Sequence, residues 1–235
     1  MKEVKPYEQA GFAMTCRSYP EYEAMFSFKE RPLGSGPVLD VAGGASSFVA
    51  EACGQGLDAV AVDPLYGQTP EKIDANGLQE IEISAGKLAA LQEQFDWTYY
   101  GSVEKSTEMR IRSLRAFSEH YAKQPERYIQ ASLPSLPFQD EAFETVLCSH
   151  FLFLYGNAAL SESFHLEALE ELLRVTRPGG EIRIYPLVTL AFKPYSGLET
   201  LEQQLQKKAC FIRENSQLPF IPGSKTYVMI RKFDR

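Results

Sequence analysis

The fold is decided by the stretch Pro37-Val-Leu-Asp-Val-Ala-Gly-Gly-Ala-Ser-Ser-Phe48 and by Ala59-Val-Ala-Val-Asp-Pro64, which follows it. Residues 38–41 form an apolar run of the length of a buried parallel strand, and the run breaks into a turn of small residues. Ser46 or Ser47 can then cap a short helix that ends near Gly54. A second apolar run covers residues 59–62. The order strand, tight loop, helix and strand predicts a βαβ unit, from which parallel sheets are built.

Two carboxylates belong to this unit. Asp40 lies inside the first apolar strand, and Asp63 lies at the tip of the second. Asp63 follows the small-residue turn by about 20 residues, the usual distance for the acid that accepts ribose hydroxyls in a βαβ nucleotide site. A carboxylate that faces a core without a polar partner is costly, so both acids favour a site for a nucleoside. The alternative for Asp63 is a helix N-cap in front of Pro64.

Length and composition limit the class of protein. A chain of 235 residues that is 44% hydrophobic predicts a single domain over residues 1–235, with a full core. The formal net charge of −7 gives no attraction to phosphates, so nucleic acid is disfavoured as a partner. No apolar run has the length of a signal-peptide core or a membrane span, which predicts a soluble protein without a membrane partner.

The four cysteines are scattered, without a CxxC spacing or a Cys/His pairing. This pattern argues against a structural metal site and a disulfide framework, so no metal ligand is predicted. It fits a reducing compartment, and the predicted location is the cytoplasm.

The N-terminal region predicts a helix that begins near Pro20. Its apolar stripe, Tyr22, Met25 and Phe26, is interpreted as core packing, with a lid over a ligand as the alternative. Residues 66–127 exceed the length that a crossover needs and are predicted to be an insertion, helical in its second half.

The insertion carries two patterns. Its helix has an apolar face, and the arginines opposite are expected to be a solvated face. The aromatic group at 95–100 is interpreted as either the wall of a substrate pocket or core packing of the insertion. The apolar face consists of Ile111, Leu114, Phe117 and Tyr121, and the arginines are Arg110, Arg112 and Arg115.

Turn residues and apolar periodicity predict the remaining strands and helices of the chain. Strands are predicted at 128–131, 145–148, 181–187, 209–213 and 225–231, helices from Ser163 and around Leu198, Leu201 and Leu205, and a break at Pro178-Gly179-Gly180.

Four motifs, in this order, closely resemble those of the class I S-adenosylmethionine-dependent methyltransferases: VLDVAGGASSF, AVAVDP, ASLPSLPFQDEAFETVLCSH and LLRVTRPGGEIRIYPL. The resemblance covers about residues 20–235 apart from the insertion, and the chain is identified as a bacterial-type member. It implies an α/β, Rossmann-like, doubly wound sheet of seven strands, mostly parallel, with an antiparallel strand in a C-terminal hairpin. It also implies S-adenosylmethionine as the cofactor.

The resemblance assigns cofactor-binding roles to residues at the strand ends. Asp40 and the loop Ala42-Gly43-Gly44 match the segment that meets the methionine and ribose parts of the cofactor. Asp63 matches the acid that takes both ribose hydroxyls. Ser132-Leu133 falls where the family contacts the adenine, and Ser149 falls where a backbone group meets the methionine amine.

The chain departs from the family pattern at three places. The glycine-x-glycine-x-glycine loop is Ala42-Gly43-Gly44-Ala45-Ser46 here, and Ser132 replaces an acid. The signature Asn/Asp-Pro-Pro-Tyr for methylating planar amines is replaced by Ser149-His150-Phe151-Leu152, which disfavours a DNA base or a glutamine amide as the acceptor.

His150 is the catalytic candidate, because it lies at the carboxyl end of a strand beside the expected methyl group and could take a proton from the acceptor. The alternative is a polar residue satisfied at a strand terminus. His120 and His165 fall in predicted helices and are expected to be solvated or packed.

Three classes of function follow. The leading hypothesis is a methyltransferase that acts on a small molecule. An NAD-dependent oxidoreductase would share the strand-turn-helix and Asp63, but it usually has the fuller G-x-G-x-x-G that this chain lacks. A cofactor-binding regulator without catalysis would account for Ala42, Ser46 and Ser132.

Overall fold

Residues 5–156 and 159–234 of the protein are described from a computed structural model. The strands are β1 (Val38–Val41), β2 (Ala59–Val62), β3 (Tyr128–Ile129), β4 (Phe143–Ser149), β5 (Thr176–Tyr185), β6 (Ala209–Asn215) and β7 (Thr226–Lys232). The α-helices are α1 (Tyr19–Met25), α2 (Phe48–Gly54), α3 (Pro70–Ala90), α4 (Val103–Lys123), α5 (Glu162–Val175) and α6 (Leu198–Leu205).

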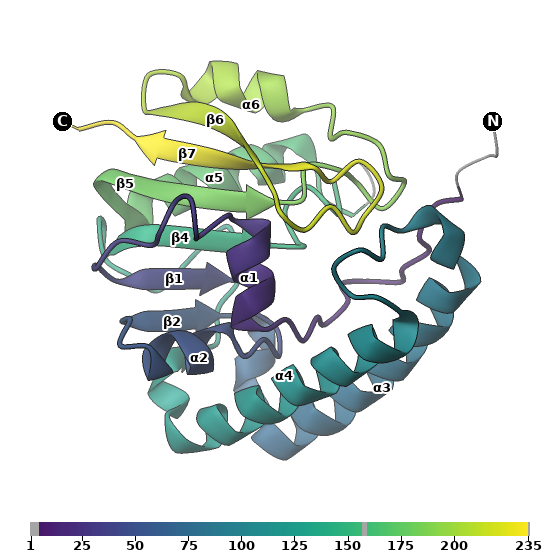
Figure 1. Ribbon diagram of the computed structural model, residues 1–235. Coiled ribbons are helices and arrows are strands. Elements are labelled where there is room, and N and C mark those ends of the chain that lie inside the picture. The colour runs from purple at the N-terminus through teal and green to yellow at the C-terminus, as the bar shows by residue number, and fades with distance from the viewer. Residues whose placement is uncertain (1–4, 157–158, 235) are drawn as a thin grey trace.

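All seven strands form one sheet in the order β3-β2-β1-β4-β5-β7-β6 (Figure 1). Neighbouring strands from β3 to β5 are parallel, whereas β7 runs antiparallel to both β5 and β6. The predicted Rossmann-like, doubly wound sheet with an antiparallel C-terminal hairpin strand is therefore confirmed. The strands β2 and β4 lie on opposite sides of β1 within the sheet, so the strand order reverses between β1 and β4. Such a reversal opens a crevice at the carboxyl ends of these two strands.

The strand β5 begins earlier than predicted. Thr176 pairs with Phe143, and the register then shifts so that Glu181 pairs with Thr145. The residues between them have no partner in this register, and Gly179 adopts a left-handed φ of 71°. Pro178-Gly179-Gly180, which was predicted to be a break before the strand, is instead a bulge inside it.

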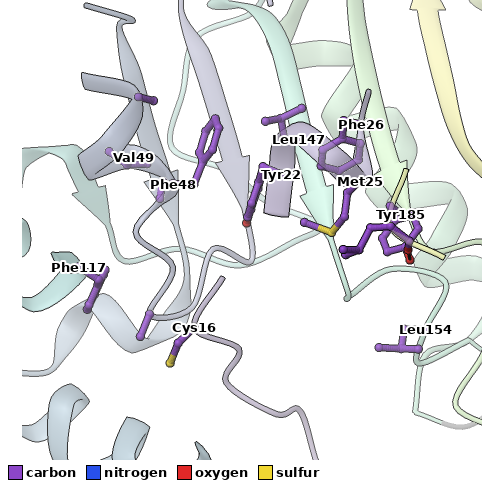
Figure 2. Packing of buried hydrophobic residues seen from close by; sticks show 14 of the residues in the cluster. Cys16, Tyr22, Met25, Phe26, Phe48, Val49, Phe117, Leu147, Leu154 and Tyr185 are labelled. Carbon is purple, nitrogen blue, oxygen red and sulfur yellow. Dashed lines mark hydrogen bonds between the residues drawn. The ribbon is translucent and has the colours of Figure 1, made fainter. Parts of the chain in front are cut away.

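The helix α1 is held at its start by a capping box, in which the backbone N–H of Ser18 donates to Glu21 Oε2 at 2.8 Å. Its stripe is buried: Tyr22 stacks on Phe48 of α2 with ring centroids 4.5 Å apart, and Met25 and Phe26 lie in the same cluster (Figure 2). Core packing is confirmed for this stripe, and the lid alternative is wrong.

The helices α3 and α4 both belong to the segment that connects β2 to β3. In the fold they lie side by side (Figure 1). A Cβ on Gly77 would meet Leu114 Cδ1 at 2.7 Å, so the glycine allows the two helices to approach closely. Leu114, Phe117 and Tyr121 are buried as predicted, and Ile111 is half-buried. No helix in the described ranges is long and apolar enough to cross a membrane.

The prediction of a solvated arginine face on α4 is wrong for one residue. Arg112 and Arg115 are exposed, but Arg110 is only 8% exposed. Its Nη2 lies 3.7 Å from Oε1 of Glu21, a residue of α1 that is fully buried. A charge partner contributed by a distant helix therefore compensates for the burial of this guanidinium.

Candidate functional site

A cavity of about 440 Å³ lies at the carboxyl ends of β1, β2 and β4. Its position is the crevice where the strand order reverses, the usual ligand position in open α/β sheets. The cavity brings together all predicted site residues except Asp40 and Gly43. The predicted residues that line it are Ala42, Gly44, Asp63, Ser132, Leu133, Ser149 and His150.

Asp63 projects into this cavity from the end of β2. Its Oδ1 accepts the backbone N–H of Leu65 at 2.9 Å, and its Oδ2 accepts that of Gly44 at 3.0 Å. The bond to Leu65 caps the short 3₁₀ turn Pro64–Gly67, so the N-cap alternative also describes this residue. Burial raises the pKa of Asp63, while the two backbone hydrogen bonds lower it. Each carboxylate oxygen has two lone pairs, so both oxygens can still accept a hydroxyl from a ligand.

The loop after β1 is shaped by two left-handed residues. Ala42 and Gly44 both have a φ of 55°. This conformation costs an ordinary residue such as Ala42 roughly 1–2 kcal/mol, which explains why a glycine is usual in such a loop. A Cβ on Gly43 would meet Tyr66 Oη at 2.8 Å and Asp40 Oδ2 at 2.9 Å. Gly43 is thus required for close packing beneath the loop.

Asp40 lies under the same loop and is almost completely buried. Its Oδ1 and Oδ2 both lie 3.0 Å from the hydroxyl of Tyr22, which donates to them. Burial raises the pKa of Asp40 well above its ordinary value, the hydrogen bond from Tyr22 lowers it, and the neighbouring Asp63 raises it further. The structure therefore places Asp40 and Gly43 behind the cavity wall, and their predicted contact with a cofactor stays a prediction.

His150 follows β4 directly and adopts a left-handed φ of 55°. Its backbone N–H donates to the carbonyl of Tyr185 at 2.6 Å, and its Nδ1 lies 3.2 Å from Ser149 Oγ. Burial lowers the pKa of His150 well below its ordinary value, and the nearby guanidinium groups of Arg17 and Arg110 lower it further. The imidazole is therefore neutral at pH 7 and able to accept a proton.

A second cavity, of about 90 Å³, adjoins the first. Five residues line both cavities and form the wall between them: Ala13, Met14, Thr15, His150 and Tyr155. The other lining residues come from the N-terminal segment, from α3, α4 and the segment between them, and from the loops after β4, after β5 and before β7. Arg17 and Arg110 line the second cavity but not the first. Arg17 was not predicted as a site residue, although its spacing from Glu21 is that of an i,i+4 ion pair.

The aromatic residues at 95–100 were interpreted as either a pocket wall or core packing, and the structure shows both. Phe95 lines the second cavity. Trp97 packs on Phe220 with ring centroids 5.1 Å apart, and its Nε1 donates to the carbonyl of Gln92 at 2.8 Å. Tyr100 is buried and bonds to Arg17. Core packing therefore describes most of the group, and a pocket wall describes Phe95.

The other two histidines are packed as expected. His165 lies in α5, with its two ring nitrogens 2.7 Å and 2.9 Å from the carbonyls of Ser161 and Leu152. His120 lies in α4 with its Nδ1 2.8 Å from the hydroxyl of Tyr128.

Comparison with known proteins gives matches in sequence and in structure. Residues 85–184 match the model of a methyltransferase domain. The chain is 31% identical over 217 residues to the uncharacterized protein MJ0045 of Methanocaldococcus jannaschii, covering 92% of this chain and 94% of that protein. The PH0226 protein from Pyrococcus horikoshii has a similar structure, with a TM-score of 0.50 at 15% identity over 92% of this chain and 90% of that one. A SAM-dependent methyltransferase from Methanosarcina mazei also gives 0.50, at 11% identity over 88% of this chain and 98% of that one.

The domain match, the sheet and the crevice together define a methyltransferase that uses S-adenosylmethionine. The chain belongs to the class I S-adenosylmethionine-dependent methyltransferases, and the M. jannaschii protein is its relative over nearly the full length of both. Because that relative is archaeal, the bacterial type stays a prediction.

The residues of the larger cavity fit this cofactor. Asp63 offers lone pairs for the ribose hydroxyls, and the apolar side chains of Val41 and Leu133 offer contacts for a flat ring. Ser132 and Ser149 add short polar side chains on the same wall.

Proposed function

We propose that this methyltransferase transfers the methyl group to a small molecule, within a single domain to which residues 66–127 are an insertion. The observation that carries the proposal is the pair of adjoining cavities with His150 in their common wall. The larger cavity would hold the cofactor through Asp63, Ser132, Leu133 and Ser149, with the loop Ala42-Gly43-Gly44 and Asp40 supporting it. The second cavity, about 90 Å³, suits a small acceptor and is too confined for a folded macromolecule. The proposed location is the cytoplasm, and nucleic acid is not the proposed partner.

S-adenosylmethionine, held by the residues of the larger cavity, would supply an electrophilic methyl group to an oxygen or nitrogen atom of the acceptor, with the electron pair of the carbon–sulfur bond kept by sulfur. His150 would take the proton that the acceptor atom loses. The walls of the two cavities would align the reactants and exclude water, which can supply most of the rate enhancement for an in-line transfer.

Two experiments test this proposal. Calorimetry with S-adenosylhomocysteine and with NAD separates a methyltransferase from an oxidoreductase, and we expect saturable binding of S-adenosylhomocysteine alone. Labelled methyl transfer from S-adenosylmethionine into a cell extract, followed by identification of the product, then tests for catalysis. Labelled small molecules are expected. Label found only in protein or nucleic acid would contradict the acceptor class, and binding without any transfer would favour a regulator.

A further inference from the structure

Two residues that line the second cavity, Arg17 and Arg110, belong to a buried cluster of charges drawn from three parts of the chain. Nη1 of Arg17 lies 3.1 Å from Oε1 of Glu21, and Nη2 of Arg110 lies 3.7 Å from the same oxygen. The hydroxyl of Tyr100 accepts from Arg17 at 2.8 Å and donates to Glu21 at 2.6 Å. Although burial raises the pKa of Glu21, the two arginines lower it below its ordinary value, so its carboxylate is ionised. Two cations thus face one anion, and the cluster carries an excess positive charge.

The guanidinium groups also have more donors than partners. A guanidinium carries five N–H groups. Within residues 5–156 and 159–234, the side chain of Arg17 donates through Nη1, while its buried Nε has no partner. Arg110 reaches the Tyr100 hydroxyl with Nη2 at 3.5 Å, at the outer limit of a hydrogen bond. A buried donor without a partner, such as Nε of Arg17, is unfavourable, and an oxyanion at this point would relieve that cost.

The other ionisable groups near the cluster do not cancel the charge. Burial raises the pKa of the Cys16 thiol to about 12, so the thiol is neutral. Burial also raises the pKa of Tyr100 and lowers that of His150, so both side chains are neutral at pH 7. Glu80 lines the cavity too, but its side chain is partly exposed, where water and salt screen its charge.

We propose that Arg17 and Arg110 bind the carboxylate of a small monoanionic ligand in the second cavity and that, if the proposed function holds, this ligand is the methyl acceptor. A single negative charge balances the cluster, whereas a dianion would leave a buried excess of negative charge. Planar guanidinium groups also match the geometry of a carboxylate. The apolar wall of Leu88, Phe95 and Phe220 would contact a short hydrocarbon body.

This ligand would also act on His150. The charges of Arg17 and Arg110 help to lower the pKa of the imidazole. A carboxylate bound between the guanidinium groups would offset that effect and make His150 a stronger base when the acceptor is in place. Binding of the carboxylate by Arg17 and Arg110 would then be coupled to proton transfer by His150.

Butyrate is the probe for the carboxylate, and butyramide is its uncharged counterpart. Binding is measured by saturation-transfer NMR, with and without saturating S-adenosylhomocysteine. We expect butyrate to bind at least about tenfold more tightly than butyramide, and also more tightly than phosphate at pH 7.5. Arg110→Met should weaken butyrate binding by a similar factor, whereas Arg110→Lys should restore part of it. Arg112→Met, a change to an exposed arginine of the same helix, should leave binding unchanged.

Equal binding of butyrate and butyramide by the wild-type protein would overturn the proposal, even if Arg110→Met failed to fold. Tighter binding of phosphate would overturn the choice of a monoanion. Because butyrate binding requires no methyl transfer, the two proposals can fail separately. Binding of S-adenosylhomocysteine without butyrate would contradict only the carboxylate site, and the reverse result would contradict only the cofactor site.

Discussion

The backbone N–H of Gly44 donates to Oδ2 of Asp63 at 3.0 Å, which joins the loop after β1 to the end of β2 across 19 positions in the chain. This contact fixes the carboxylate at the edge of the larger cavity. The same side chain also caps the turn that follows it. Asp63 therefore both shapes the site and offers acceptors to a ligand.

Asp63→Asn should weaken the binding of S-adenosylhomocysteine by about 10- to 100-fold, because hydrogen bonds to a charged group contribute about 1.5–3 kcal/mol. The amide keeps one acceptor oxygen but replaces the other with a donor, so one backbone bond is also lost and the melting temperature should fall modestly. Isothermal titration calorimetry measures the affinity, with circular dichroism as the check on folding. An unchanged affinity in a folded variant would remove Asp63 from the cofactor site.

His150→Asn should lower turnover by about 10²- to 10⁴-fold, the usual contribution of a general base, with little change in S-adenosylhomocysteine affinity. Asparagine is the better replacement here because it tolerates the left-handed backbone of this residue more readily than alanine does. The matched control is His120→Asn. His120 lies in α4 and bonds to Tyr128, and its replacement should leave turnover unchanged. If both variants kept full turnover, His150 would have no role in proton transfer.

The contribution of His150 to stability should fall as the pH drops below the ordinary histidine pKa of 6.5, because its pKa is lowered in the folded state and the unfolded chain binds the proton more readily. Asp40 and Asp63 act in the opposite sense, because their raised pKa values remove stability as the pH rises above 3.8. The contribution of His150 is isolated by comparing wild type with His150→Asn in melting experiments at pH 7.5 and pH 5.5. The wild type should lose more stability between these values, and an equal loss in both proteins would contradict the assignment.

Two glycines of α3 should respond to alanine in opposite directions. A Cβ on Gly77 would press on Leu114 at 2.7 Å, and overpacking of this kind costs about 1–3 kcal/mol. Nothing lies within 4 Å of a Cβ on Gly86, where alanine should stabilise the helix by up to about 1 kcal/mol. Urea denaturation of Gly77→Ala and Gly86→Ala measures both free energies of unfolding. A stabilising Gly77→Ala would show that α3 and α4 do not pack as described.

The sequence predicted those features that depend on short-range patterns. The apolar run at 38–41 and the position of Asp63 after the second run located the crevice, because parallel strands carry their carboxyl ends to one edge. The burial of Arg110 could not be predicted in this way, since its partner Glu21 belongs to a helix 89 residues earlier in the chain. The hydrogen bond that compensates for the burial of Asp40 could not be predicted either, because its donor, Tyr22, comes from the N-terminal helix. Side chains satisfied by distant partners leave no periodic signal in the sequence.

The wall shared by the two cavities has an energetic consequence. The carbonyl oxygen of Thr15, a residue of that wall, lies only 3.2 Å from the position of a Cβ on Gly44, so the segment rests tightly on the loop after β1. A ligand in one cavity that displaces the segment around Thr15 must alter the free energy with which the other cavity binds its ligand. Thermodynamic reciprocity then requires each ligand to change the affinity for its neighbour by the same factor, whichever arrives first.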